Sequence, residues 1–169
     1  MDQKEFSIRL VPMKDKIFRF ARSILYDVAE SEDVTQDIFE RLWAGRDRLD
    51  DCRNLDAFVM VSVKNLCYDR IRRRRLRHEG VGDPETSAPC VAAEGAEESD
   101  TVSVMMKVIA GLPETQRTVL HLRDIEGYEF NQIAVIMDMN EPAVRVTLSR
   151  ARKAVREKMI KIMEYGTHD

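Results

Sequence analysis

The stretch that decides the fold is FNQIAVIMDMNEPAVRVTLSRARKAVR, residues 130–156. Apolar side chains stand at positions 130, 133, 134 and 137, the spacing of one face of a short helix. A turn at residues 138–140 follows. Asn140 and Pro142 are typical of a helix start, because Asn caps free backbone N–H groups and Pro has no N–H to leave unpaired. A short helix, a tight turn and a long helix predict a helix-turn-helix.

The long helix has an apolar face and a basic face. The residues predicted to face the core are Val144, Leu148, Ala151, Val155, Met159 and Ile162. The opposite side carries Arg145, Ser149, Arg152 and Arg156, with Val146, Arg150 and Lys153 beside them. Arginine presents forked donors that suit guanine edges and phosphates. A basic face can also be merely solvated, but its occurrence together with the turn and the cap favours DNA binding.

The rest of the chain indicates an all-α fold. Apolar residues from 17 to 25 and from 34 to 42 follow helical spacing, and no alternating strand pattern is present. Ser31 is the expected cap of the second of these helices and Gly45 its end, and a third helix is expected over residues 55–75. Beyond residue 101, a helix should extend to Pro113 and another should stop near Gly127.

Residues 79–101 have a different composition, with seven acidic residues, no Lys or Arg, two prolines and no apolar period. Such a segment cannot bury enough apolar surface to fold, so we expect a flexible linker between domains at residues 1–78 and 102–169. The total formal charge is −3. Because this segment holds so many of the acids, the two domains together are net basic, as a partner of nucleic acid should be.

Several classes of protein are disfavoured by what the sequence lacks. No apolar run approaches the roughly 20 residues of a membrane span, and the first residues do not resemble a signal peptide, so a cytoplasmic protein is expected. Cys52, Cys67 and Cys90 form no CxxC pair and should be reduced thiols without a metal. No Gly-rich phosphate loop and no nucleophile beside a base are evident, so we expect neither an enzyme nor a bound cofactor.

A second basic element closes the predicted helix at residues 55–75. Six arginines occur within residues 70–77. The positive charges of so dense a cluster repel one another, and binding to phosphates relieves this repulsion. Asn65 and Tyr68, three residues apart, could reach one strand from one helix face, the amide reading base edges and the ring stacking. Phe58 is a further candidate. The alternatives are an RNA-binding arm or a solvated helix end beside the acidic segment.

These motifs together resemble the extracytoplasmic-function sigma factors, small two-domain promoter-recognition subunits of bacterial RNA polymerase. SEDVTQDIFERLW (31–43) is similar to the polymerase-binding segment of that family. LDAFVMVSVKNLCYDRIRRRR (55–75) is similar to the segment that melts and reads the minus-ten element. Residues 112–152 are similar to the domain that reads the minus-thirty-five element. The three motifs occur in the family's order and cover nearly the whole chain.

The resemblance implies roles for individual residues. It places Asp33, Gln36, Asp37 and Glu40 on the surface that docks on the β′ clamp helices of the polymerase. It places Asn65 beside a promoter base held out of the stack, with residues 49–56 as the loop that helps to form the pocket. With the residues selected above by spacing and charge, the predicted DNA contacts of this segment are Asn65, Tyr68, Arg70, Arg72, Arg73 and Arg74. The implied minus-thirty-five contacts are Arg145, Val146, Ser149 and Arg150, with Arg152 and Lys153 on phosphates.

The implied partners are core RNA polymerase, through its β′ and β subunits, and promoter DNA in duplex and single-stranded form. An anti-sigma factor is a further candidate. Two departures from the family pattern leave the base preference open: Asp138 replaces the usual turn glycine, and Glu141-Pro142-Ala143 opens the recognition helix. The acidic segment could also mimic nucleic acid in the RNA exit path. A helix-turn-helix repressor or activator with an N-terminal sensing or dimerisation domain is the competing interpretation, and it leaves the arginine run unexplained.

Overall fold

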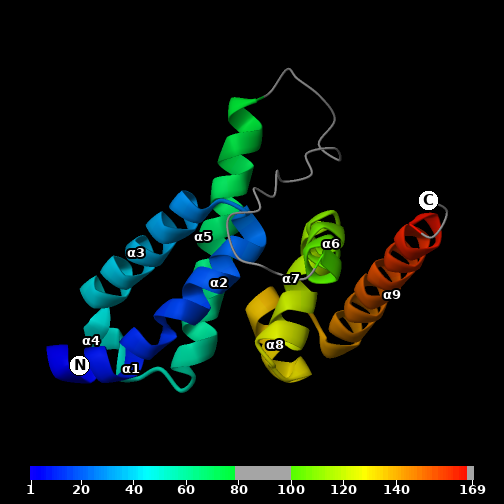
Figure 1. The fold of residues 1–169 in the computed structure, drawn as a ribbon. Helices are drawn as coiled ribbons and strands as arrows, with labels where there is room; N and C mark the ends of the chain where they lie inside the picture. The colour runs from blue at the N-terminus through cyan, green and yellow to red at the C-terminus, as the bar shows by residue number, and fades with distance from the viewer. Residues whose placement is uncertain (79–99, 167–169) are drawn as a thin grey trace.

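The computed structural model describes residues 1–78 and 100–166, and within these ranges the regular structure is entirely helical. The N-terminal half contains α1 (Gln3–Leu10), the short η1 (Val11–Met13), α2 (Lys14–Leu25), α3 (Val28–Ala44), α4 (Arg46–Leu49) and α5 (Leu55–Arg77). The C-terminal half contains α6 (Asp100–Ala110), α7 (Glu114–Leu120), η2 (His121–Ile125), α8 (Phe130–Met137) and α9 (Glu141–Tyr165). The predicted all-α class is confirmed (Figure 1).

The acidic segment predicted as a linker lies outside the described residues, apart from its last two. Asp100 and Thr101 form the first turn of α6, so the helix begins two residues before the predicted boundary. None of the described helices is long and apolar enough to cross a membrane.

The N-terminal half packs α2 between α3 and α5, and its predicted apolar stripe is confirmed. Ile17, Phe20 and Ala21 are fully buried. The predicted cap of α3 is wrong. Asp27 caps that helix by accepting a hydrogen bond from the Glu30 N–H, whereas Ser31 is buried inside it and donates its hydroxyl to the Asp27 carbonyl. The helix therefore starts one turn before the predicted position, because the Asp27 carboxylate accepts a hydrogen bond from one of its first backbone N–H groups.

The helix-turn-helix forms as predicted from its turn chemistry. Asp138 ends α8 in the left-handed region, with φ 52° and ψ 51°. This is a conformation that Asp tolerates better than most residues. Asn140 then caps α9 by accepting from the Ala143 N–H at 2.8 Å. Gly127, with φ 76°, follows the wide turn of η2 and redirects the chain towards α8.

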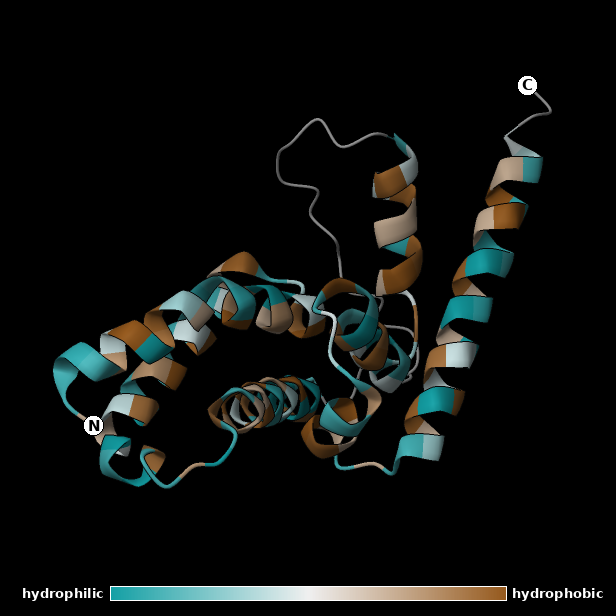
Figure 2. Cartoon of the chain, turned by 90° about the horizontal axis from the view of Figure 1, so that it is seen from below, coloured by the Kyte–Doolittle hydropathy of each residue, from teal (hydrophilic) through white to brown (hydrophobic). Residues whose placement is uncertain are grey.

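The apolar stripe of α9 is buried only over its first half. Val144, Leu148 and Ala151 are buried, Val155 and Met159 are half-buried, and the side chain of Ile162 is 44% exposed. The helix has 25 residues, whereas its packing partners α6, α7 and α8 have 11, 7 and 8. Short neighbours cannot cover a helix of this length, so hydrophobic positions continue to its free end (Figure 2). The prediction of a core role for Ile162 is wrong.

The cysteines that the structure describes, Cys52 and Cys67, are free thiols, as predicted, and Cys90 lies outside the described residues. Burial raises the pKa of the Cys67 thiol to about 12. Since the thiolate is the reactive form, Cys67 is a core residue rather than a reactive site.

We expect Leu148→Ala and Ile162→Ala to differ strongly although both remove side-chain atoms from one stripe of one helix. Leu148→Ala leaves a cavity and should lower the free energy of unfolding by about 2–5 kcal/mol. Ile162→Ala should change it by less than about 0.5 kcal/mol. Urea unfolding followed by circular dichroism measures both, and equal losses would contradict the observed end of the core.

Candidate nucleic-acid interface

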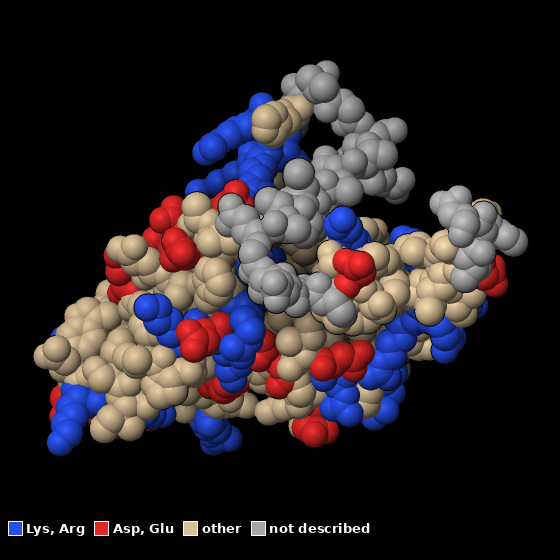
Figure 3. All heavy atoms as spheres, viewed as in Figure 1, with Lys and Arg blue, Asp and Glu red and all other residues tan. Residues whose placement is uncertain are grey.

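Charge is unevenly distributed over the surface. Figure 3 shows the Lys and Arg side chains of the α5 end as one projecting group, with Asp and Glu side chains over α3 below it. A second basic surface lies along α9. These basic surfaces lie on α5 and α9, the two helices predicted from the sequence to contact nucleic acid.

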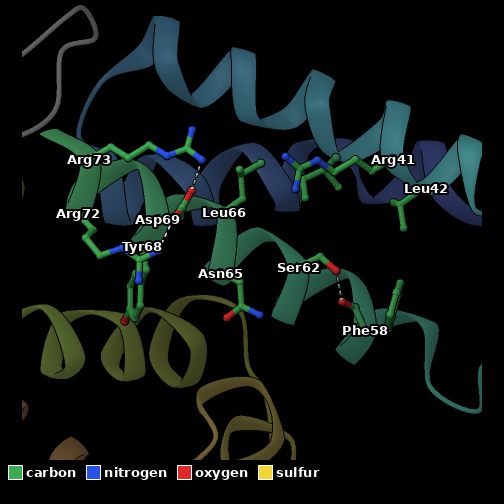
Figure 4. Close-up of a pocket in the computed structure, with 11 residues that line it drawn as sticks. Arg41, Leu42, Phe58, Ser62, Asn65, Leu66, Tyr68, Asp69, Arg72 and Arg73 are labelled. Atoms are coloured by element: carbon green, nitrogen blue, oxygen red, sulfur yellow. Dashed lines mark hydrogen bonds and ion pairs between the residues drawn. The ribbon is translucent and has the colours of Figure 1, made fainter.

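A pocket of about 740 Å³ lies between α3 and α5. Its α3 wall consists of Ile38, Arg41 and Leu42, and its α5 wall of Phe58, Ser62, Asn65, Leu66, Tyr68, Asp69, Arg72 and Arg73 (Figure 4). The pocket combines an apolar floor, an exposed aromatic ring, an amide and guanidinium groups. These are the groups that hold an unstacked base and its phosphate.

Asn65 and Phe58 line this pocket and are both exposed to solvent. Asn65 is exposed, and no hydrogen bond to the described residues occupies its amide. Phe58 is 47% exposed, a large fraction for an aromatic residue. Between them lies Ser62, whose hydroxyl donates to the Phe58 carbonyl at 2.9 Å. The Phe58 ring, the Ser62 hydroxyl and the Asn65 amide thus lie along one face of α5.

Tyr68 is placed differently from the expectation of a freely stacking ring. Its hydroxyl lies 2.9 Å from Thr118 Oγ1 of α7, in the C-terminal half. Burial raises the pKa of Tyr68 to about 12. Tyr68, which was predicted to stack on single-stranded DNA, is thus in contact with the C-terminal half of the chain.

The arginine run is not an unopposed cluster. Arg70 donates to Asp37 Oδ2 at 2.7 Å and lies 3.8 Å from Asp33, and Arg74 pairs with Glu30. These acids all belong to α3. The expected repulsion between the arginines is therefore relieved within the protein, because the carboxylates of α3 lie along α5. The sequence does not show this alignment, since the two helices are far apart along the chain.

The other members of the run face elsewhere. Arg72 and Arg73 both pair with Asp69 at the edge of the pocket and remain more than two-thirds exposed. Arg75 reaches across to Glu114 of α7 at 3.6 Å. Five of the six arginines therefore divide into two that join α5 to α3, two at the pocket, and one directed at the C-terminal half.

The acidic face predicted to bind a protein partner lies on α3. Asp33, Gln36 and Glu40 are exposed and Asp37 is half-buried beneath Arg70. Gln36 donates to Glu40 at 3.1 Å. Val34, Ile38 and Leu42 of the same helix are buried, so the polar face points outward as the spacing predicts.

Helix α9 presents its predicted DNA-binding residues to solvent. Arg145, Val146, Ser149 and Arg150 are all exposed. The Arg145 guanidinium lies 4.1 Å from the centre of the Phe130 ring, which holds its stem against α8. Arg152 is bound through both oxygens of Asp124 in η2, and Lys153 lies 3.9 Å from Glu157.

Sequence reasoning missed the pocket residues Arg41 and Ser62. Positions 58, 62, 65, 69 and 72 follow one helical stripe of α5, so helical spacing could have indicated Ser62. It also missed Arg117, which is 7% exposed and contacts both halves. Only the packing of distant helices shows that this arginine is buried.

Comparisons with known proteins match both halves. Residues 12–77 match the family model for sigma-70 region 2, and residues 104–155 match the model for sigma-70, region 4. The chain is 28% identical to the ECF RNA polymerase sigma factor SigW of Bacillus subtilis, covering 94% of this chain and 90% of that protein. It is 25% identical to the ECF RNA polymerase sigma-E factor of Escherichia coli, covering 94% and 88%.

Solved structures agree over both halves at once. The sigma factor RpoE of Bartonella quintana, crystallised with the anti-sigma factor NepR, matches with a TM-score of 0.74 at 25% identity, covering 94% of this chain and 98% of that one. CnrH, solved with the cytosolic domain of CnrY, shares the fold with a TM-score of 0.68 at 20% identity. All of the predicted site residues lie within the two matched ranges.

We expect Arg70 and Asp37 to be energetically coupled. A double-mutant cycle with Arg70→Ala and Asp37→Ala should give a coupling of about 0.5–1 kcal/mol in the free energy of unfolding, because the pair is only partly screened by solvent. The same cycle on the exposed pair Lys153 and Glu157 should give less than about 0.3 kcal/mol. Similar values for both pairs would show that Arg70 does not join α5 to α3.

Proposed function

Since the chain belongs to the sigma-70 family, as an alternative sigma factor of the extracytoplasmic-function group, we propose specific promoter and polymerase roles for its two halves. The protein directs promoter recognition and transcription initiation. The observation that carries the proposed roles is the pairing of an open pocket on α5, in the part matching region 2, with an exposed basic helix in the part matching region 4. One half receives separated DNA and the other reads duplex.

The polymerase-binding surface is the outer face of α3. Asp33, Gln36, Asp37 and Glu40 offer carboxylates and an amide to a basic surface on the β′ clamp helices, and the apolar side of the helix is already used by the core. Contacts with the β subunit come from other parts of the chain. Arg70 and Arg74 pair with the acids of α3, which favours a positioning role for them over contact with phosphates.

The minus-ten element is opened at the α5 pocket. Unstacking a base costs a few kcal/mol, which a pocket must return through stacking and hydrogen bonds. Asn65 supplies the amide for a base edge and Phe58 an exposed ring. Arg72 and Arg73 are exposed at the pocket edge and suit the phosphates of the displaced strand.

The minus-thirty-five element is read by α9. Arg145, Val146, Ser149 and Arg150 lie on the face that enters the major groove, and their exposure supports this role. Arg152 and Lys153 flank that face and suit phosphates, with Arg152 oriented by Asp124.

Further parts of the proposal concern the chain as a whole. Residues 1–78 and 102–169 act as the two promoter-reading domains and residues 79–101 as their tether. The protein is a non-catalytic initiation factor that works where the polymerase is, in the cytoplasm. Because relatives of known structure were solved with NepR and with CnrY, an anti-sigma factor is a proposed partner of this chain as well.

The test of the function is transcription from a promoter library with purified core polymerase. Addition of this protein should produce transcripts that share a two-part promoter, and the protein alone should not select those duplexes in a gel shift. A protein that binds its own duplex sites without polymerase, and starts no transcript with it, would instead be a repressor or activator.

We expect Arg145→Ala and Arg150→Ala each to weaken recognition of the upstream element by about 1–3 kcal/mol if the side chain contacts a base. The loss should depend on the upstream sequence, since only base contacts discriminate. Lys161→Ala, on the exposed far end of the same helix, is the control and should have little effect. Holoenzyme binding to matched and altered promoters measures the difference, and sequence-independent losses would assign both arginines to phosphates.

We expect Asn65→Ala to impair open-complex formation while closed-complex binding changes little, because the amide meets a base only after strand separation. Permanganate footprinting of the open region and filter binding at low temperature separate the two steps. Gln3→Ala, which removes an exposed amide from α1, is the matched control. A pre-melted promoter should restore much of the activity, and an equal loss of closed binding would contradict this role.

A further inference from the structure

One aromatic ring in the helix-turn-helix contacts two arginines from different elements. Phe130 is the first residue of α8, and the guanidinium carbon of Arg145, on α9, lies 4.1 Å from the centre of its ring. The guanidinium carbon of Arg123, on η2, lies 4.5 Å from the same centre. Both distances are within the range of cation–π attraction. Among the aromatic side chains that the structure describes, Phe130 alone has two such partners.

The Phe130 ring is held in place from several sides. The side chain is half-buried and packs against the hydrophobic core. The helix start that carries it is fixed by a hydrogen bond from the Glu129 N–H to the Gln132 side chain at 2.9 Å. Arg123 adds a further restraint, because its Nη1 donates to the Tyr128 carbonyl at 2.8 Å while the guanidinium lies against the ring. The ring is therefore a fixed surface for the second arginine.

The ring holds Arg145 without using its hydrogen-bond donors. A guanidinium carries five N–H groups, and an aromatic face attracts its charge without supplying an oxygen that would occupy them. No hydrogen bond or ion pair joins the Arg145 guanidinium to any of the residues that the structure describes. The fork of donors that suits the acceptor edge of a base therefore stays available.

The arginine at the other end of the same face is held in a different way. Arg152 lies about two helical turns further along α9 than Arg145. Its Nε and Nη2 donate to the two oxygens of Asp124, so a carboxylate occupies one side of the fork. Arg152 is thus ordered at the expense of its paired donors, whereas Arg145 is ordered with those donors free.

Arg150 has neither kind of support. It is exposed on α9, and within the described ranges neither an aromatic ring nor an acceptor lies against its guanidinium. A long side chain of this kind must be immobilised when it binds, which costs conformational entropy. Arg145 has already lost part of that freedom against Phe130. Of the two arginines proposed to read bases, Arg145 is therefore the one that is oriented before DNA binds.

We propose that Phe130 is a positioning residue for promoter specificity, whose ring orients the Arg145 guanidinium so that its free fork meets one base pair of the upstream element. This role rests on the proposed reading of that element by α9. It divides the work of the two arginines, because discrimination by Arg145 depends on Phe130 and discrimination by Arg150 does not. Phe130 acts through Arg145 and needs no contact with DNA of its own.

Two substitutions remove the ring and keep an apolar side chain in its place, Phe130→Leu and Phe130→Met. Phe130→Tyr keeps the ring and should discriminate between promoters as the unaltered protein does. Val135→Ala is the matched control, since it shortens another apolar side chain of α8, one that is 63% exposed. Circular dichroism and the unfolding temperature show that each variant is folded.

The measurement is the affinity of the holoenzyme for a promoter and for copies of it with single base-pair substitutions in the upstream element. Arg145→Ala and Arg150→Ala first identify the base pair at which each arginine discriminates. Phe130→Leu and Phe130→Met should lower discrimination about 2–5-fold at the Arg145 base pair, the loss expected from one exposed cation–π contact. Discrimination at the Arg150 base pair should not change, and Val135→Ala should change neither.

A double substitution separates positioning from a general loss of structure. Once Arg145 is replaced, the ring has no base-reading arginine to orient. Phe130→Leu should therefore weaken binding to the unaltered promoter when Arg145 is present, and should cause no further loss when it is combined with Arg145→Ala. A substitution that merely weakens the fold would instead weaken binding in both backgrounds and at every promoter.

Several results would overturn the positioning role. Unchanged discrimination in Phe130→Leu and Phe130→Met would do so, as would a loss of the same size at every base pair. A loss in Phe130→Tyr as large as that in Phe130→Leu would also do so, because the ring is retained. Base-independent weakening by Arg145→Ala would assign Arg145 to a phosphate and remove the role as well. None of these results touches the sigma assignment, which fails only if the unaltered protein starts no transcription with core polymerase.

Discussion

The interaction on which the rest of this structure depends is the burial of the Arg117 guanidinium. A buried charge needs compensation, and here it comes from backbone carbonyls of Ser23, Ile24, Ala110 and Leu112 rather than from a carboxylate. These carbonyls lie at or just beyond the C-terminal ends of α2 and α6, where helix dipoles are negative. Because the acceptors come from both halves, this side chain joins the C-terminal half to the N-terminal half.

The remaining contacts follow from that placement. With Arg117 at the end of α2, η2 lies beside α2 and brings Glu126 to Arg19, while α8 packs against α5. Helix α5, which also packs on α2, consequently contacts both α3 and the C-terminal half. Its arginines at 70 and 74 meet the acids of α3, and its Tyr68 meets the C-terminal half. The same helix thus links the surfaces proposed to bind polymerase and DNA.

Features that depend on local chemistry could be predicted from the sequence. The turn at Asp138, the cap at Asn140 and the apolar face of α2 involve neighbouring residues, and the structure confirms them. Predictions that ignored competing neighbours were wrong. Asp27 displaces Ser31 as a cap, and Ile162 stays exposed because no described helix extends far enough to cover it. The positions of Asn65 on the pocket and of Arg145 on the exposed face of α9 agree with the sequence, while their roles stay proposals.

The sequence by itself determined the all-α class, the helix-turn-helix, the order of the motifs and the family that they resemble, since periodicity, caps and turn residues are local properties of the chain. Only the tertiary structure decided which charges are paired. The acids of α3 and the arginines of α5 are more than thirty residues apart, and Arg117 is more than ninety residues from the carbonyls of α2 that it caps. Such partners are chosen by how helices pack, and burial then makes each pairing obligatory because an unpaired charge in the interior is costly.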